Sequence, residues 1–388
     1  MKKVLSSEKQ LYLYSLLGFI CFICIYLLDG IKLLTEGRVP LPPFGFIGLV
    51  ISLVLLAPFF SIKRSNSVNI WIFIFYIFAI CITLLSCTSP YFEWVDFWAF
   101  TKLFVIAPLV GYFTCMFLKL KVISLRLKTL VLSLFLILAI AVIFFHFNRS
   151  LFIETNYLRF SESILIVGIF LLTFVESPKY KIILTLGVLG ILFLSDSRFV
   201  FFSFIIIAFT YFLLNSFKAL FKLTFFILIS FLIVLIFDPE LLLESRFARL
   251  LIETSDDTSL TARSKLLSQG FLITEFYSIS GKYAYYREYC NGCYAHNFLS
   301  LWFEFGVVGI GFILFIITVI FLGMVNSLKR ILNKSLPIKV EIFYLLIAIH
   351  SIIGFLSSKH WAYFSLFLVL GMTFYILNNK DYSPSNTN

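Results

Sequence analysis

The sequence predicts an all-α, polytopic membrane protein with about twelve transmembrane helices and one long periplasmic loop. Apolar runs of membrane-spanning length recur along all 388 residues. Hydrophobic residues make up 61% of the chain and charged residues 13%, against roughly 25% charged residues in soluble domains. Basic residues gather in alternate loops, as the positive-inside rule requires. These observations exclude a soluble fold, and we expect residues 1–388 to form a single integral-membrane domain.

The apolar runs set the expected helices. A helix needs about 17 to 25 apolar residues to cross a hydrocarbon core of ~30 Å. Runs that meet or approach this length occupy residues 11–28, 44–62, 70–88, 99–118, 129–147, 163–176, 181–195, 199–216, 221–237, 298–323, 341–356 and 361–378. Some runs are short or nearly continuous with a neighbour, so eleven or thirteen helices also fit. The first run lacks a small-residue cleavage site, which favours a retained helix over a signal peptide.

The distribution of charge sets the expected orientation. With a cytoplasmic N-terminus, the inner loops and termini hold 18 of the 31 basic residues and four of the 20 acidic ones. This bias predicts that both termini are cytoplasmic and that the long hydrophilic segment, residues 238–295, is a periplasmic loop. Residues 380–388 are polar and are expected to be a disordered cytoplasmic tail. The net charge of +11 therefore reflects topology, and we expect no nucleic acid partner.

Three cations are expected at the outer face before the long loop. Lys102 lies a few residues inside a predicted helix, where it is either an anchor that reaches the interface or a cation aimed at an anionic substrate. Arg159 lies in the outer loop 148–163. Arg198 follows Ser195-Asp196-Ser197 at a tight turn between two helices, which brings its guanidinium to headgroup level. The alternative for Arg198 is a turn-stabilising pair with Asp196.

The periplasmic loop carries two helical patterns and a tyrosine-rich end. Leu260, Arg263, Leu267 and Phe271 recur at three- and four-residue spacing, which predicts an amphipathic helix on the membrane surface. Residues 243–251 show a second, shorter pattern of this kind. The end of the loop contains Arg287 and five tyrosines, namely Tyr283, Tyr285, Tyr286, Tyr289 and Tyr294. Such tyrosines suit the interfacial belt of a membrane protein or the faces of sugars.

His296 is the strongest candidate for chemistry, because it lies with Asn297 where the polar loop enters an apolar helix. An imidazole titrates near neutral pH and can accept a proton. The arginines expected on the same side of the membrane can each bind two oxygens of one phosphate group through their guanidinium. The alternative is a structural, interfacial histidine. Glu304, two turns into the following helix, is either paired with a loop arginine or functional.

Cys290 and Cys293 precede His296 in a Cys-x-x-Cys-x-x-His pattern. In an oxidising periplasm the pair could form a disulfide, remain as free thiols or hold zinc, for which a fourth ligand is not evident. The sequence contains no Asp-x-Asp, no phosphate-binding Gly-x-x-x-x-Gly-Lys and no Gly-x-Ser-x-Gly element. It therefore gives no support for a metal-dependent glycosyltransferase, a P-loop ATPase or a serine hydrolase.

Taken together, these residues resemble the O-antigen ligase and O-antigen polymerase family. His296-Asn297 followed by Gly306-Val307-Val308-Gly309 is similar to the His-Asn…Gly-x-x-Gly signature of that family. The segment 195–198 resembles its Ser-Arg element, and Ser259-Leu260-Thr261-Ala262-Arg263 resembles the arginine segment of its large periplasmic loop. Each motif is short, but their order and the expected topology also match, so the resemblance spans most of the chain.

The resemblance implies a glycosyltransferase of the bacterial inner membrane that needs no cofactor, no metal and no nucleotide sugar. Family members transfer glycan from undecaprenyl pyrophosphate either to another lipid-linked repeat unit, as polymerases, or to lipid A-core, as ligases. Membrane lipids, a chain-length regulator and a flippase are the implied partners. The implied catalytic residues are His296, which would assist or orient the attacking sugar hydroxyl, and Arg263, which with Arg198 would hold the pyrophosphate. Arg159, Lys102 and Arg287 would also bind pyrophosphate, and Asn297 and Glu304 would give support.

The polymerase activity is favoured over the ligase activity, because the short N-terminal segment and the Gly/Pro-rich first outer loop, residues 29–43, look more like polymerases. A non-enzymatic alternative is a transporter or flippase for lipid-linked oligosaccharides. Transporters usually show repeat symmetry and broken helices with charges near mid-membrane, and the sequence gives no sign of either. A structural membrane protein without activity is the third alternative.

Overall fold

The computed structural model describes residues 2–28, 44–62, 64–120, 125–147, 157–195, 197–237, 258–288, 298–333, 338–357 and 362–378. These residues are almost entirely helical and contain no strand, which confirms the predicted all-α class. The described part of the chain includes six helices that are long and apolar enough to cross a membrane, within Lys9–Tyr26, Asn66–Cys87, Trp94–Lys119, Arg198–Asn215, Leu299–Leu332 and Lys339–Ser357. The expected total of twelve spans and the side of the long loop remain predictions.

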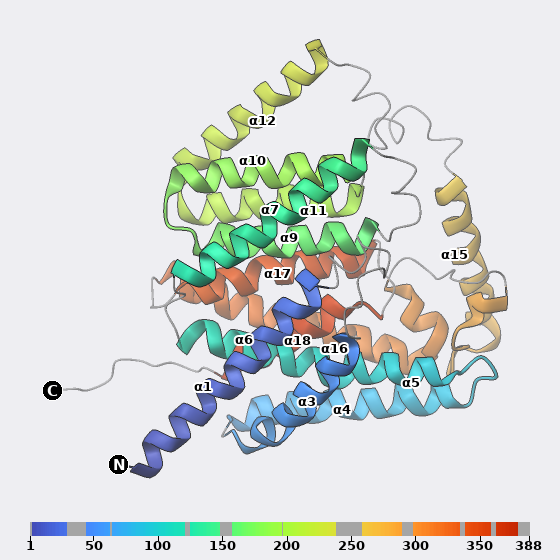
Figure 1. Ribbon diagram of the computed structural model, residues 1–388. Coiled ribbons are helices and arrows are strands. Elements are labelled where there is room, and N and C mark those ends of the chain that lie inside the picture. The colour runs from blue at the N-terminus through green and yellow to red at the C-terminus, as the bar shows by residue number, and fades with distance from the viewer. Residues whose placement is uncertain are drawn as a thin grey trace. The chain divides into compact units, whose positions relative to one another are not determined.

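The chain divides into two compact units (Figure 1). Unit 1 comprises residues 1–22, 45–122 and 261–388, and unit 2 comprises residues 23–44 and 123–260. The helices of unit 1 are α1 (Lys2–Ile23), α3 (Phe44–Ser61), α4 (Asn66–Cys87), α5 (Trp94–Thr101), the π-helical segment η2 (Lys102–Ile106), α6 (Ala107–Leu120), α15 (Thr258–Phe276), the short 3₁₀ segment η3 (Tyr285–Glu288), α16 (Leu299–Leu332), α17 (Ile338–Ser357) and α18 (Phe364–Asn378). Those of unit 2 are the π-helical segment η1 (Cys24–Leu28), α7 (Leu125–Phe147), α9 (Tyr157–Phe174), α10 (Pro178–Leu194), α11 (Arg198–Asn215) and α12 (Phe217–Phe237).

Unit 1 is packed around phenylalanine rings. Phe75 of α4 lies within 6.5 Å, between ring centroids, of rings from α16, α18 and η2. These neighbours are Phe104, Phe312, Phe315, Phe367 and Phe374. Offset and edge-to-face ring packing adds to the stabilisation from buried apolar area, so the abundant phenylalanines of the sequence serve as core here.

The closest crossing in unit 1 joins α6 to α18. A Cβ added at Gly111 would lie 2.0 Å from the Leu368 carbonyl oxygen, and one added at Gly371 would lie 1.9 Å from that of Pro108. Only the absence of both side chains lets the two backbones touch, as is common between membrane helices that pack through small residues.

In unit 2, α9 packs against α7, α10 and α11. Its residues from Phe160 to Phe174 are buried. Ser161 donates a hydrogen bond to the Ser195 hydroxyl at the end of α10, with an oxygen–oxygen distance of 2.9 Å. At the opposite end of α9, Lys128 and the exposed Glu176 form an ion pair at 3.0 Å. A helix buried on all sides is expected where neighbours surround it, and α9 is the centre of this unit.

Candidate active site

The strongest sequence candidates lie outside the described residues. These are His296, Asn297, Cys290 and Cys293. The backbone of Arg159 is in α9 and that of Arg263 is in α15, but neither side chain is described. The pattern at 243–251, the first outer loop and the C-terminal tail also lie outside the described part of the chain. The structure does describe the two segments that flank His296, namely η3 before it and α16 after it.

The helix that follows His296-Asn297 is broken at Gly306. This residue has φ of 55° and ψ of −134°, which is not helical, and a side chain is strained at such a positive φ. The break folds Leu299–Phe305 back on the rest of α16. This is seen at Gly309, where an added Cβ would lie only 1.9 Å from the Leu301 carbonyl oxygen. The Gly306-x-x-Gly309 motif thus forms a sharp bend, where the sequence predicted a continuous helix.

The bend is held by the end of α15 and the loop that follows it. Val307 N donates to the Ile279 carbonyl at 3.2 Å, and Lys282 N donates to the Phe303 carbonyl at 2.9 Å. These bonds give partners to backbone groups that the break releases. The segment directly after His296-Asn297 is therefore fixed to the segment 277–282 through main-chain contacts.

α15 confirms the helix predicted around Arg263. In Figure 1, α15 runs crosswise to α4 and α5. Leu266, Gly270 and Ile273 face the protein, and Ile273 packs in a cluster with Phe303 and Tyr285. Phe271, which is part of the predicted apolar stripe, is 43% exposed, and the position of this stripe on a membrane surface stays a prediction. The close approach of Gly270 to the Phe303 ring selects the face that packs on the protein, because a side chain at that position would collide with the ring.

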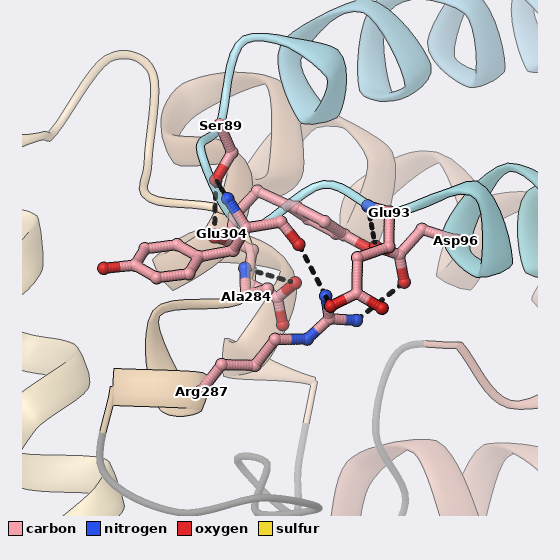
Figure 2. A network of polar contacts seen from close by, with 8 residues as sticks. Ser89, Glu93, Asp96, Ala284, Arg287 and Glu304 are labelled. Carbon is pink, nitrogen blue, oxygen red and sulfur yellow. Dashed lines mark hydrogen bonds and ion pairs between the residues drawn. The ribbon is translucent and has the colours of Figure 1, made fainter.

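Arg287 is bound by carboxylates, although the sequence suggested a pyrophosphate ligand. Its guanidinium donates to Asp96 Oδ1 at 2.7 Å and to the Tyr91 carbonyl at 2.5 Å, and lies 3.6 Å from Glu93 Oε1 (Figure 2). Burial lowers the pKa of Arg287, while the bond to Asp96 and the nearby negative charges outweigh this and raise it. Two carboxylates neutralise this cation, so Arg287 ties η3 to the start of α5.

Glu304 is buried in the same network. Its side chain is 1% exposed, and its Oε2 accepts from the Ala284 amide at 3.4 Å (Figure 2). Burial, reinforced by the Glu304 charge, raises the pKa of Tyr283 and Tyr286 far above the ordinary value, so both phenols stay protonated. The carboxylate therefore ties the bent start of α16 to the loop at Ala284, and its expected role in a catalytic site stays a prediction.

The tyrosines of this loop form part of the protein interior. Tyr283 and Tyr285 are 6% and 0% exposed, and the Tyr285 hydroxyl donates to the Leu266 carbonyl at 3.2 Å. These two rings contact neither a membrane belt nor an open sugar-binding face. The sequence interpretation was wrong for them, because it could not foresee that α15 and α16 close over the loop.

Arg198 begins α11, where the first backbone amides of the helix have no partner within the helix. Ser197 before it is fully buried, and its hydroxyl has no hydrogen-bond partner in the described residues. The backbone dipoles of a helix N-terminus and a guanidinium both favour an anion. A buried hydroxyl without a partner adds a donor, so this end of unit 2 has the properties of an anion site.

Lys102 begins the π-helical segment η2 and is half-buried. Its Nζ lies 5.4 Å from the centroid of the Trp98 ring, one turn closer to the start of the helix. This contact fits a lysine that anchors its own helix, and the alternative role, a cation for an anionic substrate, stays a prediction.

The sequence analysis missed the partner of one buried histidine. His350 of α17 is 0% exposed, and its Nε2 lies 2.9 Å from the Tyr363 hydroxyl before α18. An ionisable side chain within an apolar run was the available signal, but the partner lies just before the next helix and could not be identified from spacing.

No protein-family model and no curated protein matches the chain.

Proposed function

We propose that this chain is a glycosyltransferase that takes glycan from undecaprenyl pyrophosphate and transfers it to the sugar hydroxyl of another lipid-linked repeat unit, as an O-antigen polymerase does. The observation that supports this most is the anion site at the start of α11. There Arg198, the N-terminus of a helix and the buried hydroxyl of Ser197, which has no hydrogen-bond partner in the described residues, lie next to one another in the chain. All three favour an anion such as a pyrophosphate group.

The proposed reaction is a displacement at the anomeric carbon of the donor sugar. The acceptor oxygen forms a bond to that carbon, and the bond from carbon to pyrophosphate oxygen breaks with its electron pair on the pyrophosphate. His296 accepts the hydroxyl proton. Because pyrophosphate is already a good leaving group, the protein has to position the acceptor and stabilise the developing charge. Arg198 and Arg263 stabilise the charge that develops on the pyrophosphate, and Arg159 and Lys102 assist them.

In the proposed mechanism Arg287 and Glu304 have supporting roles, and neither binds the substrate. Arg287 is held by Asp96 and lies beside Glu93, so in the proposed mechanism it supports the loop and does not bind pyrophosphate. Glu304 and the Gly306 bend hold the start of α16. His296 and Asn297 precede this start by a few residues, so a rigid α16 would limit where the imidazole can lie.

The proposed setting is the bacterial inner membrane, with twelve spans, both termini in the cytoplasm and the reaction on the periplasmic side. The positive-inside bias of the loops supports this orientation. A chain-length regulator and a flippase are the proposed protein partners. Attachment of the glycan to lipid A-core, the ligase reaction, uses the same donor and is the nearest alternative.

A transporter or flippase for the same lipid-linked glycan is the second candidate function. No broken helix was expected from the sequence, but α16 is broken at Gly306, and discontinuous helices are common at transporter substrate sites. Gly306 lies close to the start of α16, and 26 residues of the helix follow it. That remainder is long enough to span a membrane alone, which favours a bend at the interface over a mid-membrane site.

Deletion of the gene, followed by gel analysis of the surface polysaccharide, tests these candidates. A single repeat on the lipid core indicates a polymerase, and accumulated lipid-linked polymer without attached glycan indicates a ligase. Loss of all periplasmic lipid-linked repeats indicates a flippase. An unchanged ladder contradicts all three functions.

Point variants then test the mechanism. His296→Ala should abolish long glycan chains while the protein remains in the membrane, and Arg198→Lys should shorten them, because an ammonium group lacks the paired donors of a guanidinium. Lys218→Gln, which changes an exposed residue of α12, is the control. A normal ladder in His296→Ala would remove His296 from the mechanism.

A further inference from the structure

A second basic site lies in unit 1, in the short turn between α3 and α4. The side chain of Arg64 turns back over the end of α3, with its Cζ 3.9 Å from the centroid of the Phe59 ring and 5.2 Å from that of Tyr112. It also donates to the Phe59 carbonyl oxygen. The two rings partly shield the cation from water, and this strengthens its attraction for an anion.

Two polar groups at this place lack partners. The Nε of Arg64 and the hydroxyl of Tyr112 are buried and make no hydrogen bond of ordinary geometry in the part of the chain described here. The Tyr112 hydroxyl lies beside both the guanidinium and the Asn378 side chain. Asn378 is fixed from the other side, because its Oδ1 accepts from the Ser65 amide at 3.1 Å. Buried donors are normally satisfied, so the unbonded Nε of Arg64 beside a phenol and an amide indicates a missing acceptor.

Within the described ranges, no carboxylate is paired with Arg64. None of the ion pairs between described residues involves Arg64. Arg287 is the contrasting case in the same unit, since Asp96 and Glu93 flank it. A shielded guanidinium without a carboxylate, beside a phenol and an amide, has the donors that recognise a phosphate group.

We propose that Arg64, Tyr112 and Asn378 bind the phosphate group of an anionic phospholipid. The site lies just after α3 ends at Ser61, where the apolar run 44–62 also ends and we expect the chain to leave the membrane. Leu53, Val54 and Phe60 of α3 are 58%, 48% and 60% exposed, so acyl chains can contact the helix below the headgroup. The positive-inside orientation places this lipid in the cytoplasmic leaflet, apart from the proposed transfer site.

Native mass spectrometry of the full-length protein in a zwitterionic detergent tests the proposal, with added phosphatidylglycerol as the probe. The affinity for this lipid should fall about tenfold or more in Arg64→Gln, because the charge-assisted bonds to phosphate are lost. It should fall by about threefold in Tyr112→Phe, which removes one hydroxyl and keeps the ring. Lys218→Gln removes an equal charge from an exposed position and should leave the affinity unchanged.

A parallel titration with inorganic phosphate separates the two sources of the phosphate group. Binding of phosphatidylglycerol that depends on Arg64, without comparable binding of inorganic phosphate, supports a lipid site. Equal dependence for both probes supports a phosphate site filled from solution. Retention of the lipid at wild-type affinity in both Arg64→Gln and Tyr112→Phe overturns the proposal. If Arg64→Gln does not fold, Arg64→Lys replaces it, since that variant keeps the charge and loses Nε.

Discussion

Substitution of Gly306 by alanine should unfold the start of α16. The residue has φ of 55° and ψ of −134°, and holding a side chain in such a region costs on the order of 1–3 kcal/mol. The new Cβ would also lie 2.3 Å from the Ile279 carbonyl oxygen, which is backbone and cannot rotate away. We therefore expect Gly306→Ala to lower the free energy of unfolding by about 3 kcal/mol or more, or to release the segment before it.

Gly187→Ala is the matched control. Gly187 lies in α10, and an added Cβ there would meet nothing within 4 Å. Alanine is favoured over glycine inside a helix by about 1 kcal/mol, so this variant should be as stable as the wild type or slightly more stable. The two substitutions are chemically identical, and only the surroundings differ.

Thermal unfolding in detergent measures the stability of both variants, and limited proteolysis reports whether the segment around residue 298 has become accessible. The glycan ladder of cells that carry each variant measures function. Equal melting temperatures and equal proteolysis for Gly306→Ala and Gly187→Ala would refute the bend at Gly306. A stable, intact Gly306→Ala protein with shortened glycan chains would show that the bend serves activity more than stability.

Three further outcomes follow from contacts described above. Ser197→Ala should leave the melting temperature unchanged, because the hydroxyl has no partner in the described residues, but should shorten the glycan ladder if the site binds pyrophosphate. Tyr363→Phe should destabilise the protein by about 1–3 kcal/mol in thermal unfolding, since the buried His350 loses a bond of 2.9 Å. Arg287→Gln should lower the free energy of unfolding by roughly 1–3 kcal/mol, because Asp96 is buried and loses its partner. The double variant Arg287→Gln/Asp96→Asn should recover part of this loss in the same assay.

The fold class and the helix positions could be predicted because they depend on local composition. Each predicted apolar run coincides with a helix wherever the structure describes it, since twenty apolar residues in succession allow few other structures in a membrane. The helix around Arg263 could also be predicted, because the three- and four-residue spacing of its apolar residues is a local pattern. The face that packs on the protein could not be predicted, because the ring of Phe303 selects Gly270.

The arrangement of the site could not be predicted, because it depends on residues far apart in the chain. Arg287 is held by Asp96, 191 positions earlier, and no local pattern pairs them. Gly306 and Gly309 lie in an apolar run that has the composition of an ordinary helix, and only the approach of Ile279 makes the bend necessary. Sequence motifs identified which residues matter there, and tertiary contacts decided what each of them does.

The contact between Gly111 and Gly371 sets an order for biosynthesis. The two glycines are about 260 residues apart in the chain, and at 5–20 residues per second the ribosome needs roughly 13 to 52 s to reach the second one. Until then the backbone of α6 around Gly111 lacks the α18 backbone that packs on it in the folded protein. Assembly of unit 1 therefore finishes only after α18 is made, and a ribosome that stalls before α18 leaves α6 without this contact.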